Sequence, residues 1–252
     1  MAIATRPESP GEFEIEAGDD FLLGSSATID GGSFTGLIVP GATGGLPTVS
    51  EVVVEIYRVF PLDSDTGRTI NVPNRNNSPS DVAFDSRDSS SDLSFSTSIL
   101  SGTFTALNSV QPGGIHPQPG QTTGGNGAIS GEEVQFNFSF TTPLDLPANH
   151  YFFVPQVELT GGGQFYWLSA SRPISGAGTT PITPDLQVWT RDENLDPDWL
   201  RVGTDIVGGT TPPTFNAAFS LDGTVAPEPS LIWLTLAAGL AIVGVRRYLA
   251  IR

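Results

Sequence analysis

Carboxylates are the only side chains of this sequence that could do chemistry in quantity. The 252 residues include 27 Asp and Glu against 11 Arg, with two His, no Cys and no Lys. Without Cys there is no thiol nucleophile or Cys-ligated zinc, and without Lys there is no Schiff base or P-loop. The Gly-x-Ser-x-Gly motif of many hydrolases is also missing. The sequence therefore favours a protein that is not an enzyme and that needs no cofactor.

Three acidic stretches contain oxygen ligands of the kind that Ca²⁺ prefers. The first begins like an EF-hand loop at Asp63, but Arg68 occupies the sixth position in place of Gly and Asn74 the twelfth in place of Glu. A second stretch spaces four Asp over residues 81–92, and a third crowds acidic residues before Trp199. We expect acidic surface turns, with calcium binding as the alternative at Asp63, Asp65, Asp192, Asp196 and Asp198.

The remaining candidates for a site are the two His and three of the Trp. A His-based metal site would need both His116 and His150 together with carboxylates, so we expect one solvated loop His and one turn His. Trp167, Trp189 and Trp199 could form a platform on which sugar rings stack. Aromatic side chains of this size more often fill the core of a β-sandwich, and we expect that here.

The elements that carry these residues are predicted to be β-strands. Residues 134–141 and 93–99 alternate apolar and polar side chains with period 2, and residues 51–60 form a longer, mostly β-branched run. No helical stretch is long enough for a crossover, which favours an all-β, antiparallel β-sandwich of the jelly-roll or immunoglobulin-like kind. Further strands are expected at residues 13–15, 33–39, 103–110, 151–159, 165–169, 186–190 and 215–221.

A long polar segment, residues 111–131, interrupts this pattern. It is rich in Gly, Pro, Gln and Thr and nearly free of large apolar residues. A loop of about 20 residues is unusual inside a compact domain, so it is either a functional loop or a linker between two half-size sandwiches. We favour one sandwich over residues 13–224, preceded by a flexible N-terminus over residues 1–12 that could be the remnant of a signal peptide.

Residues 146–151 read Leu-Pro-Ala-Asn-His-Tyr and lead into a strand. They resemble the L-x-A-G-x-Y segment of exported β-sandwich domains, in which the Tyr packs across a corner and its hydroxyl bonds nearby backbone. Asn149 stands in place of the usual Gly, and Asn also accepts a left-handed conformation.

The segment from residue 225 to residue 252 differs in composition from the rest of the chain. Pro-Glu-Pro at residues 227–229 precedes an uncharged run, residues 231–245, which is followed by two Arg. As a helix the run would span about 22 Å, which is short for a bilayer core of about 30 Å. Its length alone favours a buried helix. However, the run is apolar around its whole circumference and a basic pair follows it, and these two features favour a membrane segment instead.

These three parts, in this order, resemble the PEP-CTERM sorting signal. The resemblance implies recognition by an exosortase, a membrane protease of Gram-negative bacteria that make exopolysaccharide, and removal of the helix and Arg pair. It implies a recognition motif at Pro227, Glu228 and Pro229. The membrane-anchoring residues would be Leu231, Trp233, Leu236, Leu240, Val243, Arg246 and Arg247.

Export also requires a signal at the N-terminus, and residues 1–5 contain neither a charged leader nor an apolar run. Ala2-Ile3-Ala4 resembles a cleavage site, so we expect the true start to lie upstream. The chain before Pro227 has 8 basic and 26 acidic residues, a net charge of −18, which would repel nucleic acid.

Together these observations predict an exported structural or adhesive protein of the cell envelope or exopolysaccharide matrix. The expected partners are an exosortase-type processing protease, the membrane and exopolysaccharide. The alternatives are a carbohydrate-binding or carbohydrate-cleaving surface domain, and a soluble protein with a buried C-terminal helix.

Overall fold

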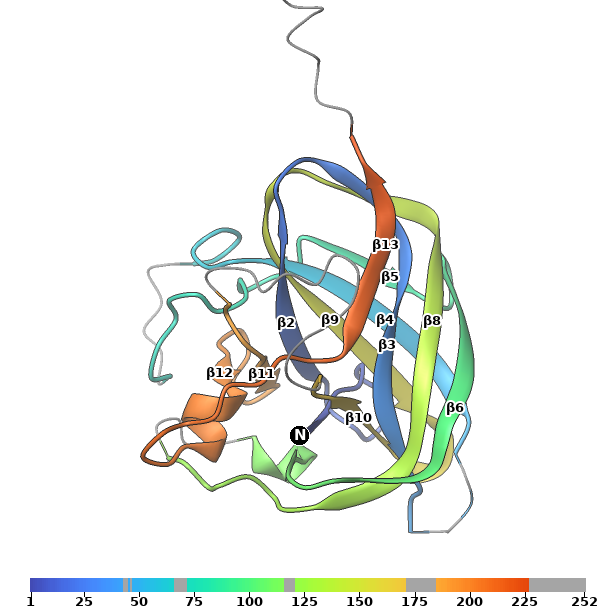
Figure 1. The fold of residues 1–252 in the computed structure, drawn as a ribbon, viewed down its shortest axis with the longest axis vertical. Helices are drawn as coiled ribbons and strands as arrows, with labels where there is room; N and C mark the ends of the chain where they lie inside the picture. The colour runs from blue at the N-terminus through green and yellow to red at the C-terminus, as the bar shows by residue number, and fades with distance from the viewer. Residues whose placement is uncertain (43–44, 46, 66–71, 116–120, 171–184, 227–252) are drawn as a thin grey trace, which may run out of the picture.

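Two β-sheets packed face to face form the body of the protein in a computed structural model (Figure 1). The structure describes residues 1–42, 45, 47–65, 72–115, 121–170 and 185–226. One sheet has the strand order β6-β8-β3-β10-β1-β7, with β13 also paired to β3, and the other has the order β12-β11-β2-β9-β4-β5. The predicted all-β sandwich is therefore confirmed.

The strands of the seven-stranded sheet are β1 (Ala2–Ala4), β3 (Ala27–Val39), β6 (Leu93–Ala106), β7 (Ser109–Val110), β8 (Ile129–Leu146), β10 (Gln164–Leu168) and β13 (Phe219–Val225). Those of the six-stranded sheet are β2 (Ile15–Leu23), β4 (Val49–Arg58), β5 (Asp85–Asp88), β9 (Asn149–Leu159), β11 (Trp189–Asp192) and β12 (Leu200–Arg201). Within the described residues, three short helical turns connect them: η1 (Pro112–Gly114), η2 (Thr160–Gly162) and the π-helix η3 (Val202–Val207).

The main core lies between the two sheets and is rich in aromatic rings. In β8 the predicted alternation holds, because Phe136 and Phe138 are buried while Asn137 between them faces solvent. Phe34 of β3 stacks on Phe136 with 4.8 Å between ring centroids, and Phe153 of β9 stacks on Phe138 at 5.8 Å. The first contact lies within the seven-stranded sheet, and the second joins the two sheets through their inward-facing side chains.

The strands on the two sides of residues 111–131 belong to one sheet. β6 pairs with β8 in antiparallel register from Leu93 opposite Phe140 to Ala106 opposite Ile129. The segment 111–131 therefore connects parts of a single sandwich. All pairings between named strands are antiparallel except that of β1 with β7, which is parallel.

The N-terminus differs from the flexible segment expected over residues 1–12. Ala2, Ile3 and Ala4 form β1, lie between β10 and β7, and are at most 1% exposed. Their small and apolar side chains fill the core, so these residues belong to the fold. Cleavage after Ala4 would remove a core strand, which contradicts our interpretation of this tripeptide as a cleavage site.

The predicted tyrosine corner is present at the turn from β8 to β9. The Tyr151 side chain is buried, and its hydroxyl donates a hydrogen bond of 2.8 Å to the carbonyl oxygen of Pro147. Asn149 does not adopt the left-handed conformation that we allowed for. It begins β9, where its Oδ1 accepts a hydrogen bond from the amide of His150.

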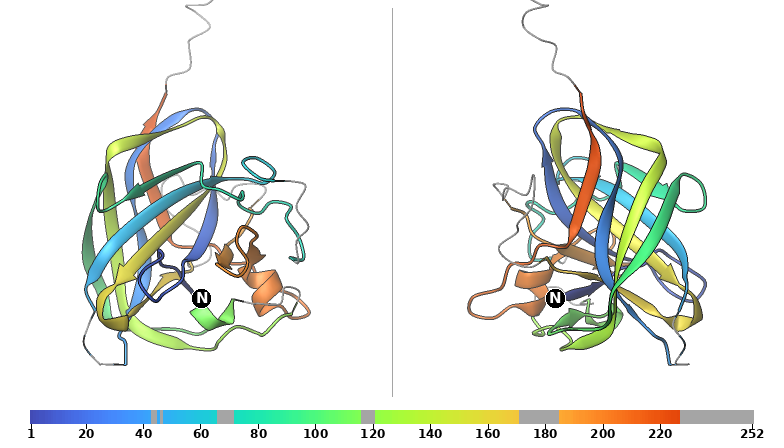
Figure 2. Two further views of the ribbon diagram at one scale, coloured as in Figure 1. Left: turned by 180° about the vertical axis from the view of Figure 1, so that it is seen from behind. Right: turned by 45° about the vertical axis from the view of Figure 1, so that its right-hand side comes forward.

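A second, smaller hydrophobic cluster covers the outer face of the six-stranded sheet. It joins side chains of β4 and β9 to side chains from residues 186–199. Its buried members are Tyr57, Phe152, Val154, Leu186, Trp189 and Trp199. Figure 2 shows this covering segment on the side of the body opposite β6. The six-stranded sheet is therefore buried on both faces, whereas the seven-stranded sheet shows much of its outer face to solvent.

The predicted C-terminal helix and anchor lie outside the described residues. Among the residues that the structure describes, no helix has the length and apolar character needed to cross a bilayer.

Candidate functional site

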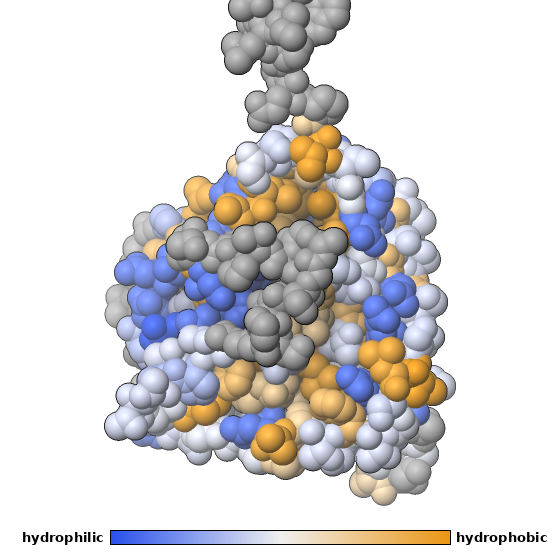
Figure 3. Space-filling view, in the orientation of Figure 1, coloured by the Kyte–Doolittle hydropathy of each residue, from blue (hydrophilic) through white to orange (hydrophobic). Residues whose placement is uncertain are grey.

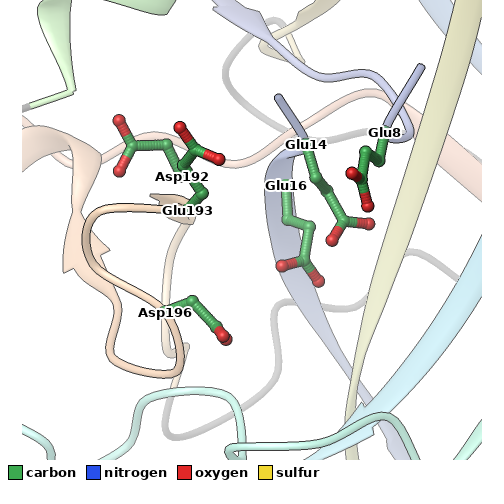
Figure 4. Close-up of a pocket in the computed structure, with 6 residues that line it drawn as sticks. All are labelled: Glu8, Glu14, Glu16, Asp192, Glu193 and Asp196. Carbon is green, nitrogen blue, oxygen red and sulfur yellow. The ribbon is translucent and has the colours of Figure 1, made fainter. Parts of the chain in front are cut away.

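An acidic pocket of about 190 Å³ lies beside β2 and β11 of the six-stranded sheet. Figure 4 shows the carboxylates of β2 and of the N-terminal segment on one side of it, facing those of the turn after β11. The lining residues are Glu8, Glu14, Glu16, Asp192, Glu193 and Asp196.

The start of β2 and the residue before it place two of these carboxylates on the outer face of the sheet. Ile15 and Ala17 point into the main core, so their neighbours Glu14 and Glu16 point the opposite way, as period 2 requires. Asp192 ends β11, which pairs with β2, and it lies opposite Ile15 in the ladder. This pairing brings the segment 192–196 next to β2.

Arg191 is the cation at the centre of this acidic region. Its Nε donates to Oε2 of Glu16, its Nη1 lies 3.1 Å from Oδ1 of Asp196, and its Nη2 donates to the hydroxyl of Tyr57 at 2.9 Å. Its guanidinium also lies 4.4 Å from the ring centroid of Trp199. Burial alone would lower the pKa of Arg191, but Glu16 and Tyr57 raise it, so the side chain stays charged.

Three carboxylates converge beside this cation. Oxygens of Glu14, Glu16 and Glu55 lie within 4.8 Å of one another. The Tyr57 hydroxyl is 2.6 Å from Oε1 of Glu16 and 3.1 Å from Oε2 of Glu55, so it can donate its single proton to either carboxylate.

Burial and the neighbouring charges change the protonation of this cluster. Burial, with Glu16 and Glu14 nearby, raises the pKa of Glu55 to about 8. Burial and the charge of Glu16 also raise the pKa of Glu14. Glu55 therefore keeps its proton at neutral pH, next to the carboxyl groups of Glu14 and Glu16.

This arrangement can bind a proton, and its oxygens are the type that a divalent cation takes as ligands. The residues that could hold such a cation are Glu14, Glu16 and Glu55. Both oxygens of Glu16 already have partners in Arg191 and Tyr57.

The structure divides the five calcium candidates of the sequence between different places. Asp192 and Asp196 line the acidic pocket, and two backbone amides of the turn after it donate to Asp192. Asp63 pairs with Arg58, and Asp198 lies 3.0 Å from Nε of Arg75. The amide of Asp65 donates to Oδ2 of Asp81.

Sequence reasoning missed the glutamates of the pocket and of the carboxyl cluster. Within residues 12–16 the signal was the acidic side chain at every second position, which places Glu14 and Glu16 on one strand face. No local signal links them to Arg191, which is 175 positions from Glu16. The residues that were missed are Glu8, Glu14, Glu16 and Glu55, whereas Glu193 belongs to the acidic stretch before Trp199 that the sequence indicated.

The three candidate Trp are core residues, as expected, because each is at most 1% exposed. The indole N–H groups of Trp189 and Trp199 donate to backbone carbonyls, and that of Trp167 does the same. None of these rings is available for stacking on a sugar.

The turn His has an acidic partner that the sequence did not predict. His150 Nε2 lies 2.6 Å from Oδ2 of Asp20, and Oδ1 of Asp20 accepts the amide of Leu186. His116, the sorting motif and the anchor residues lie outside the described residues. No protein-family model, curated protein or solved structure matches this chain.

Proposed function

We propose that this chain is an exported, surface-sorted protein with a structural or adhesive role in the envelope or exopolysaccharide matrix of a Gram-negative bacterium. An exosortase-type protease recognises Pro227, Glu228 and Pro229. Residues 231–245 form an apolar helix that anchors the chain in the membrane before processing. The function requires no catalytic group and no cofactor.

The observation that carries this proposal is where the folded body ends. β13 ends at Val225, which is 64% exposed, and the amide of Ala226 donates to the carbonyl oxygen of Ser26. The motif begins at the next residue. Figure 1 shows β13 ending at the tip of the body. Cleavage near the motif would therefore leave every described strand intact.

The fold and charge of the body support the same proposal. A sandwich of the jelly-roll or immunoglobulin-like kind with a tyrosine corner suits an exported domain. Its net charge of −18 favours solubility and disfavours nucleic acid as a partner. The carbohydrate-binding alternative loses the feature that motivated it, because the three candidate Trp are buried.

The test is made in the native cells with the chromosomal gene. Changing Pro227 and Pro229 together to Ala is expected to leave the protein folded but to retain the unprocessed form in the membrane fraction. The matched control changes Pro212 and Pro213 to Ala in a loop of the body and is expected to be processed normally. Normal processing of the first variant would contradict the proposed motif.

A further inference from the structure

Five strands of the described structure lie at sheet edges, and β6 differs from the other four. β7 and β12 have two residues each, and β5 has four, three of them charged. β13 carries Asp222 and a register shift beside it. β6 has 14 residues, Leu93–Ala106, with no charged residue and no Pro. Natural edge strands are usually blunted by charge, Pro, shortness or bulges. The register shifts of β6 lie beyond Ile99, and its stretch 93–99 has none of these devices.

The free edge of β6 is open to solvent. Ten of its 14 residues are exposed, including Ile99 at 64%, Leu100 at 53% and Phe104 at 37%. Figure 3 shows hydrophobic residues gathered on the side of the body where Figure 1 places β6. The strand pairs only with β8, so one row of its backbone groups has no strand partner within the described residues.

The ladder with β8 identifies that row. The amide of Thr141 donates to the carbonyl oxygen of Asp92, directly before β6. Because backbone groups alternate between the two sides of an antiparallel strand, the even-numbered residues of the regular stretch 93–99 point to β8. The N–H and C=O groups at the free edge belong to Leu93, Phe95, Thr97 and Ile99.

The charge of the body restricts what can approach this edge. Because the net charge of the body is −18, two copies repel each other wherever their acidic surfaces come together. The stretch 93–99 is neutral, so two copies can meet there without opposing charges. Beyond Ile99, register shifts interrupt the ladder with β8 and end the regular stretch.

We propose that the free edge of β6 binds the same edge of a second copy, forming a two-fold symmetric dimer with one continuous sheet. The two stretches 93–99 run antiparallel about Ser96, so that Leu93 lies opposite Ile99 of the other copy and Phe95 lies opposite Thr97. All four residues of the free row then form hydrogen-bonded pairs. The interface is independent of export and sorting.

This register also covers apolar surface. Leu93 and Phe95 lie at the margin of the main core, and Ile99 on the same strand face is largely exposed. In the dimer, Ile99 of each copy packs beside Leu93 of the other, extending both cores across the interface. Ser94, Ser96 and Ser98 remain on the outer face.

Cross-linking of the full-length chain in mild detergent tests this register, and the absence of native Cys makes one introduced Cys unique. In Ser96→Cys the two thiols face each other in a non-hydrogen-bonded pair with about 4.5 Å between Cα atoms, within disulfide range. In the control Ser94→Cys, on the same strand face, the two positions are about 13 Å apart. Mild oxidation is expected to give disulfide dimers of the first variant and monomers of the second.

A second substitution distinguishes edge pairing from chance collision. Thr97→Pro removes an N–H group of the free edge and no hydrogen bond to β8, so the variant is expected to fold. Combined with Ser96→Cys, it is expected to reduce the disulfide dimer at least tenfold with an unchanged unfolding temperature. Monomeric Ser96→Cys, equal cross-linking of Ser94→Cys, or cross-linking that survives Thr97→Pro would each overturn the proposal.

Discussion

Arg191 and Glu16 form a buried ion pair that fastens the segment after β11 to the outer face of β2. Each residue is at most 5% exposed, and the guanidinium also donates to the carbonyl oxygens of Asp81 and Pro197. One side chain thus joins three segments that are distant in sequence. The second hydrophobic cluster lies around this pair, because Tyr57 and Trp199 contact the same guanidinium.

Removing one partner of this pair should destabilise the protein strongly. Glu16→Gln leaves the buried Arg191 without its closest counter-charge, and we expect a loss of about 3–5 kcal/mol in the free energy of unfolding. The control is Asp196→Asn, which changes the other carboxylate on Arg191. Its side chain is 61% exposed, so we expect a loss below about 1 kcal/mol. Equal losses in the free energy of unfolding of the two variants, measured by urea denaturation, would contradict the central role of Glu16.

The carboxyl cluster should make stability fall as pH rises. Glu55 has a pKa of about 8 in the folded state and about 4.5 when unfolded, so the folded state binds the extra proton between these values. Its contribution is full below pH 4.5 and is lost as pH rises through 8. Glu55→Gln should therefore be more stable than the wild type at pH 9 and should show a smaller loss between pH 5 and pH 9. A variant with the wild-type pH profile would exclude Glu55 as the source.

Asp19 and Asp20 are neighbours, but replacing each of them by Asn is expected to change the stability of the protein in opposite directions. Asp19 is fully buried, which raises its pKa well above the usual range, and its Oδ1 has no hydrogen-bond partner among the described residues. Asp19→Asn keeps the acceptor for the amide of Ala217 and removes a buried charge, so it should stabilise the protein at pH 7. Asp20→Asn weakens the contacts to His150 and Leu186 and should destabilise it. If both variants changed the free energy of unfolding in urea in the same direction, this distinction would be contradicted.

The tyrosine corner should contribute a small, measurable stability. Tyr151→Phe removes the hydroxyl that donates to Pro147 and leaves the packing of the ring unchanged. The expected loss is about 1 kcal/mol, the usual value for one such hydrogen bond. Chemical denaturation at neutral pH measures it. An unchanged midpoint would mean that water replaces the bond at no cost.

The strands that the sequence predicted best are those with one solvated face. β8 alternates because its inner residues fill the core and its outer residues face water. β2 escaped prediction because residues 15–20 are all buried, and Glu16, Asp19 and Asp20 interrupt any hydrophobic run. β1 has only three residues, too few to show a period.

The candidate site was predictable only where its residues are close in sequence. Asp192 and Asp196 were recognised as a group because they occupy one turn. Glu16 and Arg191 meet through the pairing of β2 with β11, and no pattern along the chain specifies that pairing. A buried Glu in a strand is read from sequence as a surface residue, because its partner becomes visible only in the folded structure.

The intact mass of the mature protein from native cells tests export and sorting at once. The expected product lacks the residues after the Pro227–Pro229 region and retains the whole body, including β1 and β13. A cytoplasmic product that extends to Arg252 would contradict the sorting proposal and leave an acidic β-sandwich without an assigned role.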